Sequence, residues 1–128
     1  MTKTLHSKNS MMMAMELSNK KWKLAFSNGQ KVRQVNVDWG AEKSLLRQIE
    51  TAKEKLGLCK DADVYSCYEA GRDGFWIDRL LKKNGINNIV VDPASIEVNR
   101  RKRRAKTDRL DANKLVLMMI RYLSLIHI

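Results

Sequence analysis

The residues of this chain that could do chemistry are acids, and two of them follow a run of bases. Asp108 and Asp111 come just after Arg100 to Lys106, a stretch in which six of seven residues are basic. On a helix, acids three residues apart lie on one face, where they can share a cation. The spacing equally suits a structural role, with Asp108 as a helix N-cap and Asp111 as an acid favoured by the helix dipole. On spacing alone the structural interpretation is favoured.

Two further acids, Glu16 and Glu69, each lie at the end of an apolar segment that is typical of a strand. Neighbouring strands would place both at one edge of a sheet, and a helix starting near Asp108 would bring Asp108 and Asp111 there. Four crowded acids repel one another unless cations neutralise them. Two Mg²⁺ ions about 3.5–4 Å apart would do so and would act on a phosphodiester. Taken singly, Glu16 also suits a solvent-facing acid and Glu69 a turn residue.

The histidine content excludes several other chemistries. The chain has two histidines, His6 and His127, each near one end of the sequence. A core without histidine has no Ser-His or Cys-His nucleophile and no expected zinc site. Any chemistry must therefore use carboxylates, which suit hard cations such as Mg²⁺.

The positive charge of the chain is concentrated in the segment Arg100 to Arg109. The net charge is +11, and this segment holds seven basic residues and one Asp, a contribution of +6. Concentrated charge indicates a polyanionic partner, and a basic loop beside an acid site would hold the DNA backbone against the repulsion of those acids. A solvated loop or a localisation signal would have a similar composition. Aromatic residues are scarce near the segment, so base stacking is not indicated. The predicted nucleic-acid-binding residues are Arg100, Arg101, Lys102, Arg103, Arg104, Lys106 and Arg109.

The elements that must position these residues follow from hydrophobic periodicity and turn signals. After a loose tail at 1–10, strands are predicted at 11–18, 20–27, 31–37, 63–71 and 86–93, and helices at 41–58, 75–83 and from about 108 to 122. The order βββαβαβ followed by a last helix predicts an α/β fold with a mixed sheet, helices on its faces, and three antiparallel strands first. This order fits an RNase H-like fold.

Location and thiol chemistry follow from what the sequence lacks. No apolar run is long enough to cross a membrane, and Met11 to Met15 is too short for a signal peptide. We therefore expect a cytoplasmic protein. Cys59 and Cys67 are not in a C-x-x-C arrangement, so two reduced and mostly buried thiols are expected.

Several motifs together resemble one known family. "YEAG" at Tyr68 to Gly71, "KTDRLDA" at Lys106 to Ala112 and "ELSNKKWKLAFSNG" from Glu16 are similar to the amino-terminal, RuvC-like domain of DEDD-motif insertion-sequence transposases. These are the insertion sequence one-hundred-ten family, or bridge-RNA-guided recombinases. The resemblance covers 11–122 and matches Glu69, Asp108 and Asp111 to three of the family's acids. Glu16 stands where the family usually has Asp, so its longer side chain must be accommodated.

The resemblance implies DNA transposition and recombination with bound Mg²⁺, a structured guide RNA, and a homo-oligomer at full length. It also implies a carboxy-terminal domain with a catalytic serine, so we expect this chain alone to be inactive in complete transposition. Residues 123–128 resemble translated adapter sequence, although their apolar residues also suit a helix end. Two other functions stay open, a nucleic-acid-binding module without activity and a metal-dependent nuclease that acts alone. Mg²⁺ binding discriminates among them.

Overall fold

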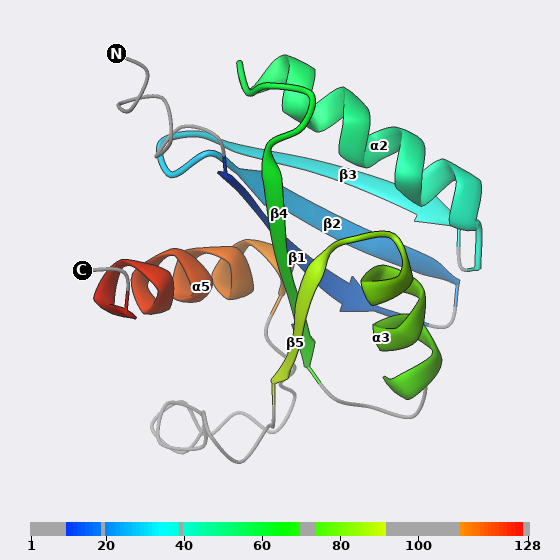
Figure 1. The fold of residues 1–128 in the computed structure, drawn as a ribbon. Helices are drawn as coiled ribbons and strands as arrows, with labels where there is room; N and C mark the ends of the chain where they lie inside the picture. Colours follow the sequence, from blue (N-terminus) through cyan, green and yellow to red (C-terminus); the bar gives the residue numbers. More distant parts are fainter. Residues whose placement is uncertain (1–9, 19, 39, 70–73, 92–110, 127–128) are drawn as a thin grey trace.

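A five-stranded mixed sheet forms the centre of the protein (Figure 1). The computed structural model describes residues 10–18, 20–38, 40–69, 74–91 and 111–126. The strands are β1 (Ser10–Leu17), β2 (Lys21–Ser27), β3 (Val32–Asp38), β4 (Asp63–Glu69) and β5 (Asn87–Val91). They lie in the order β3-β2-β1-β4-β5.

The strand directions divide the sheet at β1. β1, β2 and β3 form an antiparallel meander, whereas β4 and β5 run parallel to β1. The helices are α2 (Glu42–Lys55), α3 (Gly74–Lys83) and α5 (Ala112–Ile126). The predicted element order and the antiparallel meander are confirmed, and the arrangement is an RNase H-like α/β fold.

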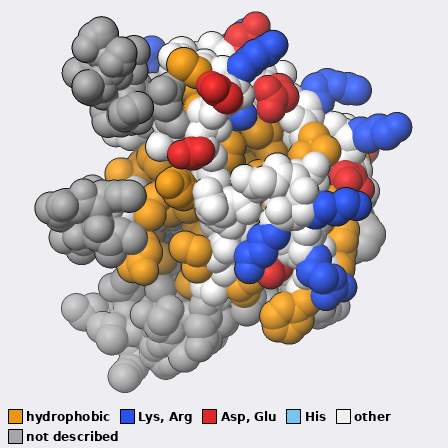
Figure 2. All heavy atoms as spheres, viewed as in Figure 1, with side chains coloured by type: hydrophobic (Ala, Val, Ile, Leu, Met, Phe, Trp, Pro, Cys, Tyr) orange, Lys and Arg blue, Asp and Glu red, His pale blue; other side chains and the backbone are white. Residues whose placement is uncertain are grey.

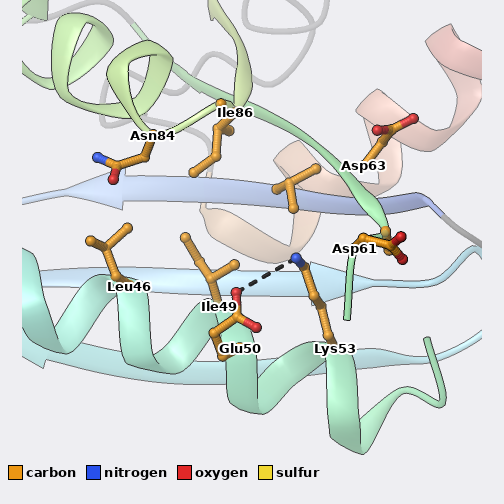
Figure 3. Close-up of a pocket in the computed structure, with 11 residues that line it drawn as sticks. Leu46, Ile49, Glu50, Lys53, Asp61, Asp63, Asn84 and Ile86 are labelled. Carbon is orange, nitrogen blue, oxygen red and sulfur yellow. Dashed lines mark ion pairs between the residues drawn. The ribbon is translucent and has the colours of Figure 1, made fainter. Parts of the chain in front are cut away.

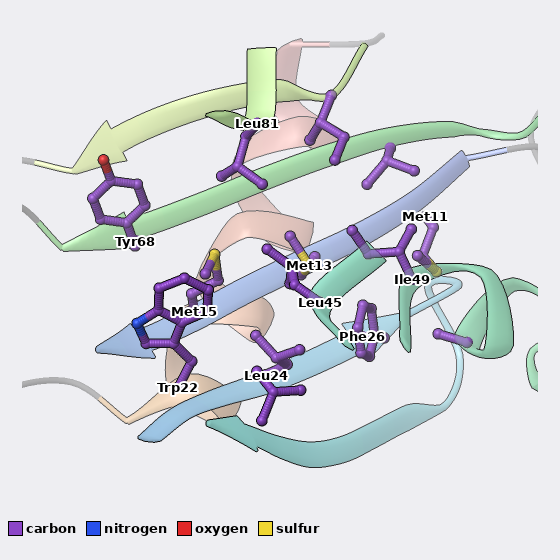
Figure 4. Close-up of a cluster of buried hydrophobic side chains, with 14 of the residues drawn as sticks. Met11, Met13, Met15, Trp22, Leu24, Phe26, Leu45, Ile49, Tyr68 and Leu81 are labelled. Atoms are coloured by element: carbon purple, nitrogen blue, oxygen red, sulfur yellow. The ribbon is translucent and has the colours of Figure 1, made fainter. Parts of the chain in front are cut away.

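Each face of the sheet packs against different helices, which divides the core in two. Met11, Met13 and Met15 of β1 lie in the larger core, with residues of α2 and α3 (Figure 4). Met12 and Ala14 point to the opposite face, where they pack with residues of α5. β1 therefore buries both of its faces, because side chains alternate along a strand. Every residue from Met11 to Met15 is accordingly apolar and buried.

α2 and α3 end in the same way. Gly57 and Gly85 have φ of +72° and +79°, a conformation that glycine adopts without strain. The N–H of Leu58 donates to Lys53 O at 2.8 Å, and the N–H of Ile86 donates to Leu81 O at 3.0 Å. Both are the long hydrogen bond of a Schellman motif, so each helix ends where its glycine predicts.

Two expectations about individual residues are wrong. The last helix begins at Ala112, after Asp111, and not near Asp108. Cys59 is exposed, because it lies in the connection between α2 and β4, whereas Cys67 is buried as expected. Burial raises the pKa of the Cys67 thiol to about 12. No helix among the described residues has the length and apolar character needed to cross a membrane.

Candidate functional site

Glu16 and Glu69 lie at the same edge of the sheet because their strands are parallel neighbours. Met15 pairs with Tyr68, so the next residue of each strand is Glu16 and Glu69 respectively. Adjacent strands are about 4.8 Å apart. Tyr65 and Cys67 of β4 contact the core beneath α5, so the alternation along the strand places Glu69 on the α5 face as well.

Asp111 joins this edge through the start of α5. The N–H of Ala112 donates to Glu16 Oε1 at 3.3 Å, so the Glu16 carboxylate lies at the amino terminus of the helix. Asp111 is the N-cap, and its Oδ1 accepts a hydrogen bond from the N–H of Lys114 at 2.8 Å. We call Glu16, Glu69 and Asp111 the acid edge. The partial positive charge of a helix amino terminus offsets part of the repulsion among these acids.

The longer side chain of Glu16 is accommodated by this helix. The Glu16 side chain extends from β1 to the first backbone N–H of α5. The resulting hydrogen bond joins residues 96 positions apart. The structural interpretation of the sequence makes Asp108 the N-cap and Asp111 an acid inside the helix, but Asp111 is itself the capping residue because α5 begins at Ala112. Asp111 thus combines a structural function with a place beside Glu16.

The donor atoms of the acid edge suit a hard cation. Glu16 and Asp111 each use one carboxylate oxygen for a backbone N–H, and the described residues provide no partner for the second oxygen of either. Among the described residues, no group of three or more His, Cys, Asp or Glu side chains lies close enough to enclose a metal ion. Mg²⁺ is usually held by one or two carboxylates together with water and substrate phosphate. The carboxylates present therefore fit Mg²⁺ by donor type.

Lys23 is a residue of this edge that the sequence did not single out. It pairs directly with Glu16 across β1 and β2, and directly opposed residues share a face. Lys23 is exposed and makes no ion pair with any described acid. Only the strand register places this cation beside the acids, so no local motif could have identified it.

The other predicted site residues belong to the segment 92–110, which is outside the described part of the chain. Asp108 lies outside the described residues, as do the seven predicted nucleic-acid-binding residues. The roles of these residues stay predictions. Of the predicted acids, the structure brings Glu16 and Asp111 together and aligns Glu69 with Glu16 on the neighbouring strand.

The opposite edge of the sheet also carries acids, around a hollow of about 420 Å³ (Figure 3). We call Glu50, Lys53, Asp61 and Asp63 the far edge. Lys53 Nζ lies 3.6 Å from Glu50 Oε2 and donates a hydrogen bond to Lys60 O at 2.8 Å. At the far edge, the buried Lys53 therefore lies close to acidic side chains and balances the charge of Glu50.

Two curated bacterial proteins are similar to this chain. "Putative transposase y4rJ" of Sinorhizobium fredii is 38% identical over 114 residues, which is 85% of this chain and 29% of that protein. "Transposase for insertion sequence element IS1533" of Leptospira borgpetersenii is 39% identical over 72 residues, 56% of this chain and 20% of that protein. The chain thus spans less than a third of either relative.

Other comparisons add a structural neighbour. The catalytic core domain of BIV integrase is similar with a TM-score of 0.37 and 15% sequence identity, covering 76% of this chain and 65% of that one. No protein-family model matches the chain.

Proposed function

We propose that this chain is the carboxylate-bearing domain of a DNA transposase, with Glu16, Glu69, Asp108 and Asp111 as ligands of Mg²⁺. The observation that carries the proposal is the meeting of β1, β4 and α5 at one edge, with an acid from each. The similarity to two transposases supports the reaction class.

The residues of the chain have distinct tasks in this proposal. Bound Mg²⁺ would stabilise the attacking and leaving oxygens of a phosphodiester. Glu16 and Asp111 would hold the cation with their second carboxylate oxygens, while the start of α5 fixes the first oxygen of each. Lys23 contacts a DNA phosphate beside the acids, and the basic residues of 100–109 contact further phosphates of the DNA backbone. A structured guide RNA and assembly with further copies belong to the same proposal, by the motif resemblance.

A binding module without catalysis is the second candidate. The observation that favours it is that Glu16 and Asp111 both accept backbone N–H groups of α5, a role that would keep these acids in place without any metal. The two candidates differ in whether the acids bind a cation, so cation binding decides between them.

The test is Mn²⁺ binding to the 128-residue chain, measured by electron paramagnetic resonance, with Mn²⁺ as the probe for Mg²⁺. Glu69→Gln and Asp111→Asn should each weaken binding by about tenfold or more, a loss that even indirect support of a metal ligand can cause. Asp111→Asn should leave unfolding unchanged, because Asn caps helices as well as Asp does.

The matched control is Asp63→Asn, at the first position of the strand that ends with Glu69. It removes the same charge from the other end of β4 and should leave Mn²⁺ binding unchanged. Equal Mn²⁺ affinity in wild type, Glu69→Gln and Asp111→Asn would reject the metal site and favour the binding module. If the variants do lose Mn²⁺ affinity, Mg²⁺-dependent nicking of DNA by wild type that is lost in Glu69→Gln would establish the chemistry.

A further inference from the structure

Phe75 is the most exposed of the large apolar side chains that the structure describes. Its exposed fraction is 72%, whereas Phe26 is fully buried. Phe75 lies in the first turn of α3, six residues after Glu69 at the end of β4. Most of the Phe75 ring is therefore available for contact with another molecule.

The start of α3 is fixed near the carboxyl end of β1 by its second aromatic residue. The rings of Trp76 and Trp22 are tilted, with centroids 5.9 Å apart, and Trp22 is fully buried. Trp22 pairs with Leu17, the residue that follows Glu16 in β1. The first turn of α3 is therefore held against the end of β1 that carries an acid, although on the opposite face of the sheet.

A second attachment holds the middle of α3. Asn88 Nδ2 of β5 donates to Asp78 Oδ1 at 2.8 Å, and Ser66 of β4 donates to Asn88 at 2.7 Å. The hydrogen bond from Asn88, followed by the nearby Lys82, lowers the pKa of Asp78. Because both Trp76 and Asp78 are anchored, the exposure of Phe75 follows from its direction on the helix.

The same exposed side of α3 carries cations. Arg79 lies one turn beyond Phe75, about 6 Å along the axis, and Lys82 and Lys83 follow in the last turn. Lys82 pairs with Asp78 at 3.2 Å, whereas Arg79 and Lys83 form no ion pair with a described acid. Figure 2 shows Lys and Arg side chains gathered over the α3 side of the molecule.

We propose that the outer side of α3, on the sheet face opposite the acid edge, binds a single strand of nucleic acid, with Phe75 stacked on an unpaired base and Arg79 and Lys83 on its phosphates. A basic surface that follows the backbone and an aromatic ring for the bases are the two parts of sequence-tolerant single-strand binding. The inference rests on the proposed function for the partner being nucleic acid, and it assigns base stacking that the sequence did not indicate.

The positive charge of the outer side of α3 favours nucleic acid over protein as the partner. The cores of protein interfaces are depleted of charged residues, and specific interfaces bury about 1,200–2,000 Å² in total. On α3, a single strongly exposed ring stands next to three exposed basic residues. A strand of nucleic acid supplies both a flat apolar base and the negative charge that this surface requires.

The experiment measures fluorescence anisotropy of labelled single-stranded oligo-dT, oligo-U of equal length and a DNA duplex, each with the 128-residue chain at one salt concentration. Phe75→Leu keeps an apolar side chain but removes the ring, and Phe75→Trp keeps a ring. The matched control is Tyr122→Leu, which removes another exposed ring, 53% accessible, from α5.

Phe75→Leu should weaken single-strand binding about five- to tenfold, the lower part of the range measured for one stacked base. Phe75→Trp and Tyr122→Leu should bind like wild type, and duplex affinity should not change in any variant. A larger loss with oligo-dT than with oligo-U assigns the strand to DNA, and the reverse assigns it to RNA. Unchanged affinity in Phe75→Leu, or an equal loss in Tyr122→Leu, overturns the proposal.

A second measurement does not depend on variants. Irradiating wild type with an oligonucleotide that contains 5-iododeoxyuridine should yield a cross-linked peptide that includes Phe75. Cross-links confined to other peptides overturn the assignment. Wild type that binds no nucleic acid would reject both this proposal and the nucleic-acid part of the proposed function. Intact Mn²⁺ binding alongside unaltered Phe75→Leu affinity would reject this proposal alone.

Discussion

The two edges of the sheet both carry acids, but different groups balance the charge at each. At the far edge, Lys53 lies 3.6 Å from Glu50, one turn earlier on α2, and also donates a hydrogen bond to the carbonyl of Lys60 at 2.8 Å. At the acid edge, the backbone N–H groups at the start of α5 contact Glu16 and Asp111. A lysine neutralises a full charge, whereas a helix terminus offers roughly half of one.

This difference determines what each edge can bind. Lys53 is a fixed counter-ion for Glu50, so the chain itself already balances one of the three far-edge acids. At the acid edge, Glu16 and Asp111 each keep one carboxylate oxygen that has no partner among the described residues. The number of acids therefore does not identify a metal site, and the nature of their partners does.

Loosening α5 tests the comparison most strongly. Leu115 of α5 is fully buried between the helix and the sheet, and Leu115→Ala should lower the free energy of unfolding by about 2–5 kcal/mol. Urea denaturation measures the loss, and hydrogen exchange should show lost protection at α5 and the end of β1, with α2 unaffected. The control is Leu117→Ala on the same helix, which is 54% exposed and should change stability by at most about 0.5 kcal/mol. Equal losses would show that α5 is not seated as described.

Removing the far-edge cation has a smaller effect. Lys53→Met keeps the apolar stem but leaves Lys60 O without its donor, so unfolding free energy should fall by about 1–2 kcal/mol. The exposed Lys55 of the same helix provides the control, Lys55→Met, with almost no loss. Mn²⁺ affinity should be unchanged in both variants, and a change in Lys53→Met would contradict the independence of the two edges.

Removing the acid-edge cation should affect binding and barely affect folding. Lys23→Ala should change unfolding free energy by at most about 0.5 kcal/mol. It should reduce the slope of log affinity for DNA against log salt by about one, as expected for one lost phosphate contact. Lys21→Ala is the matched control, two residues away on the same face, because Lys21 already pairs with Asp38 at 3.4 Å. An equal slope change in the two variants would remove Lys23 from the site.

The helices and strands were predictable because local hydrophobic periodicity specifies them. The site was predictable only in part, because local periodicity does not specify how neighbouring strands align. The alternation of Trp22, Leu24 and Phe26 predicted β2, and all three are buried. The start of α5 was misplaced because Asp108 and Asp111 suit a helix start equally well by composition. The pairing of Lys23 with Glu16 depends on how two strands align, which neither strand specifies alone.

The aromatic residues illustrate the same limit. The sequence places Trp22 and Trp76 54 positions apart, and only the folded chain shows their rings in contact. Phe75 and Trp76 read alike as apolar residues of a helix, yet 72% of one and 36% of the other is exposed. The direction of a side chain on a short helix requires knowledge of the surface against which the helix packs.

The long-range bond from Ala112 to Glu16 has a consequence for how the protein is made. Every strand has been synthesised once Val91 is added, but α5 is completed only at Ile126, 35 residues later. At about 5–20 residues per second, translation covers that interval in roughly 2–7 s. Until α5 is complete it cannot fully cover the sheet face with Met12 and Ala14, and its first N–H reaches Glu16 only after Asp111 and Ala112 have been added. Among the described elements, the acid edge is therefore completed after every described strand of the sheet has been synthesised.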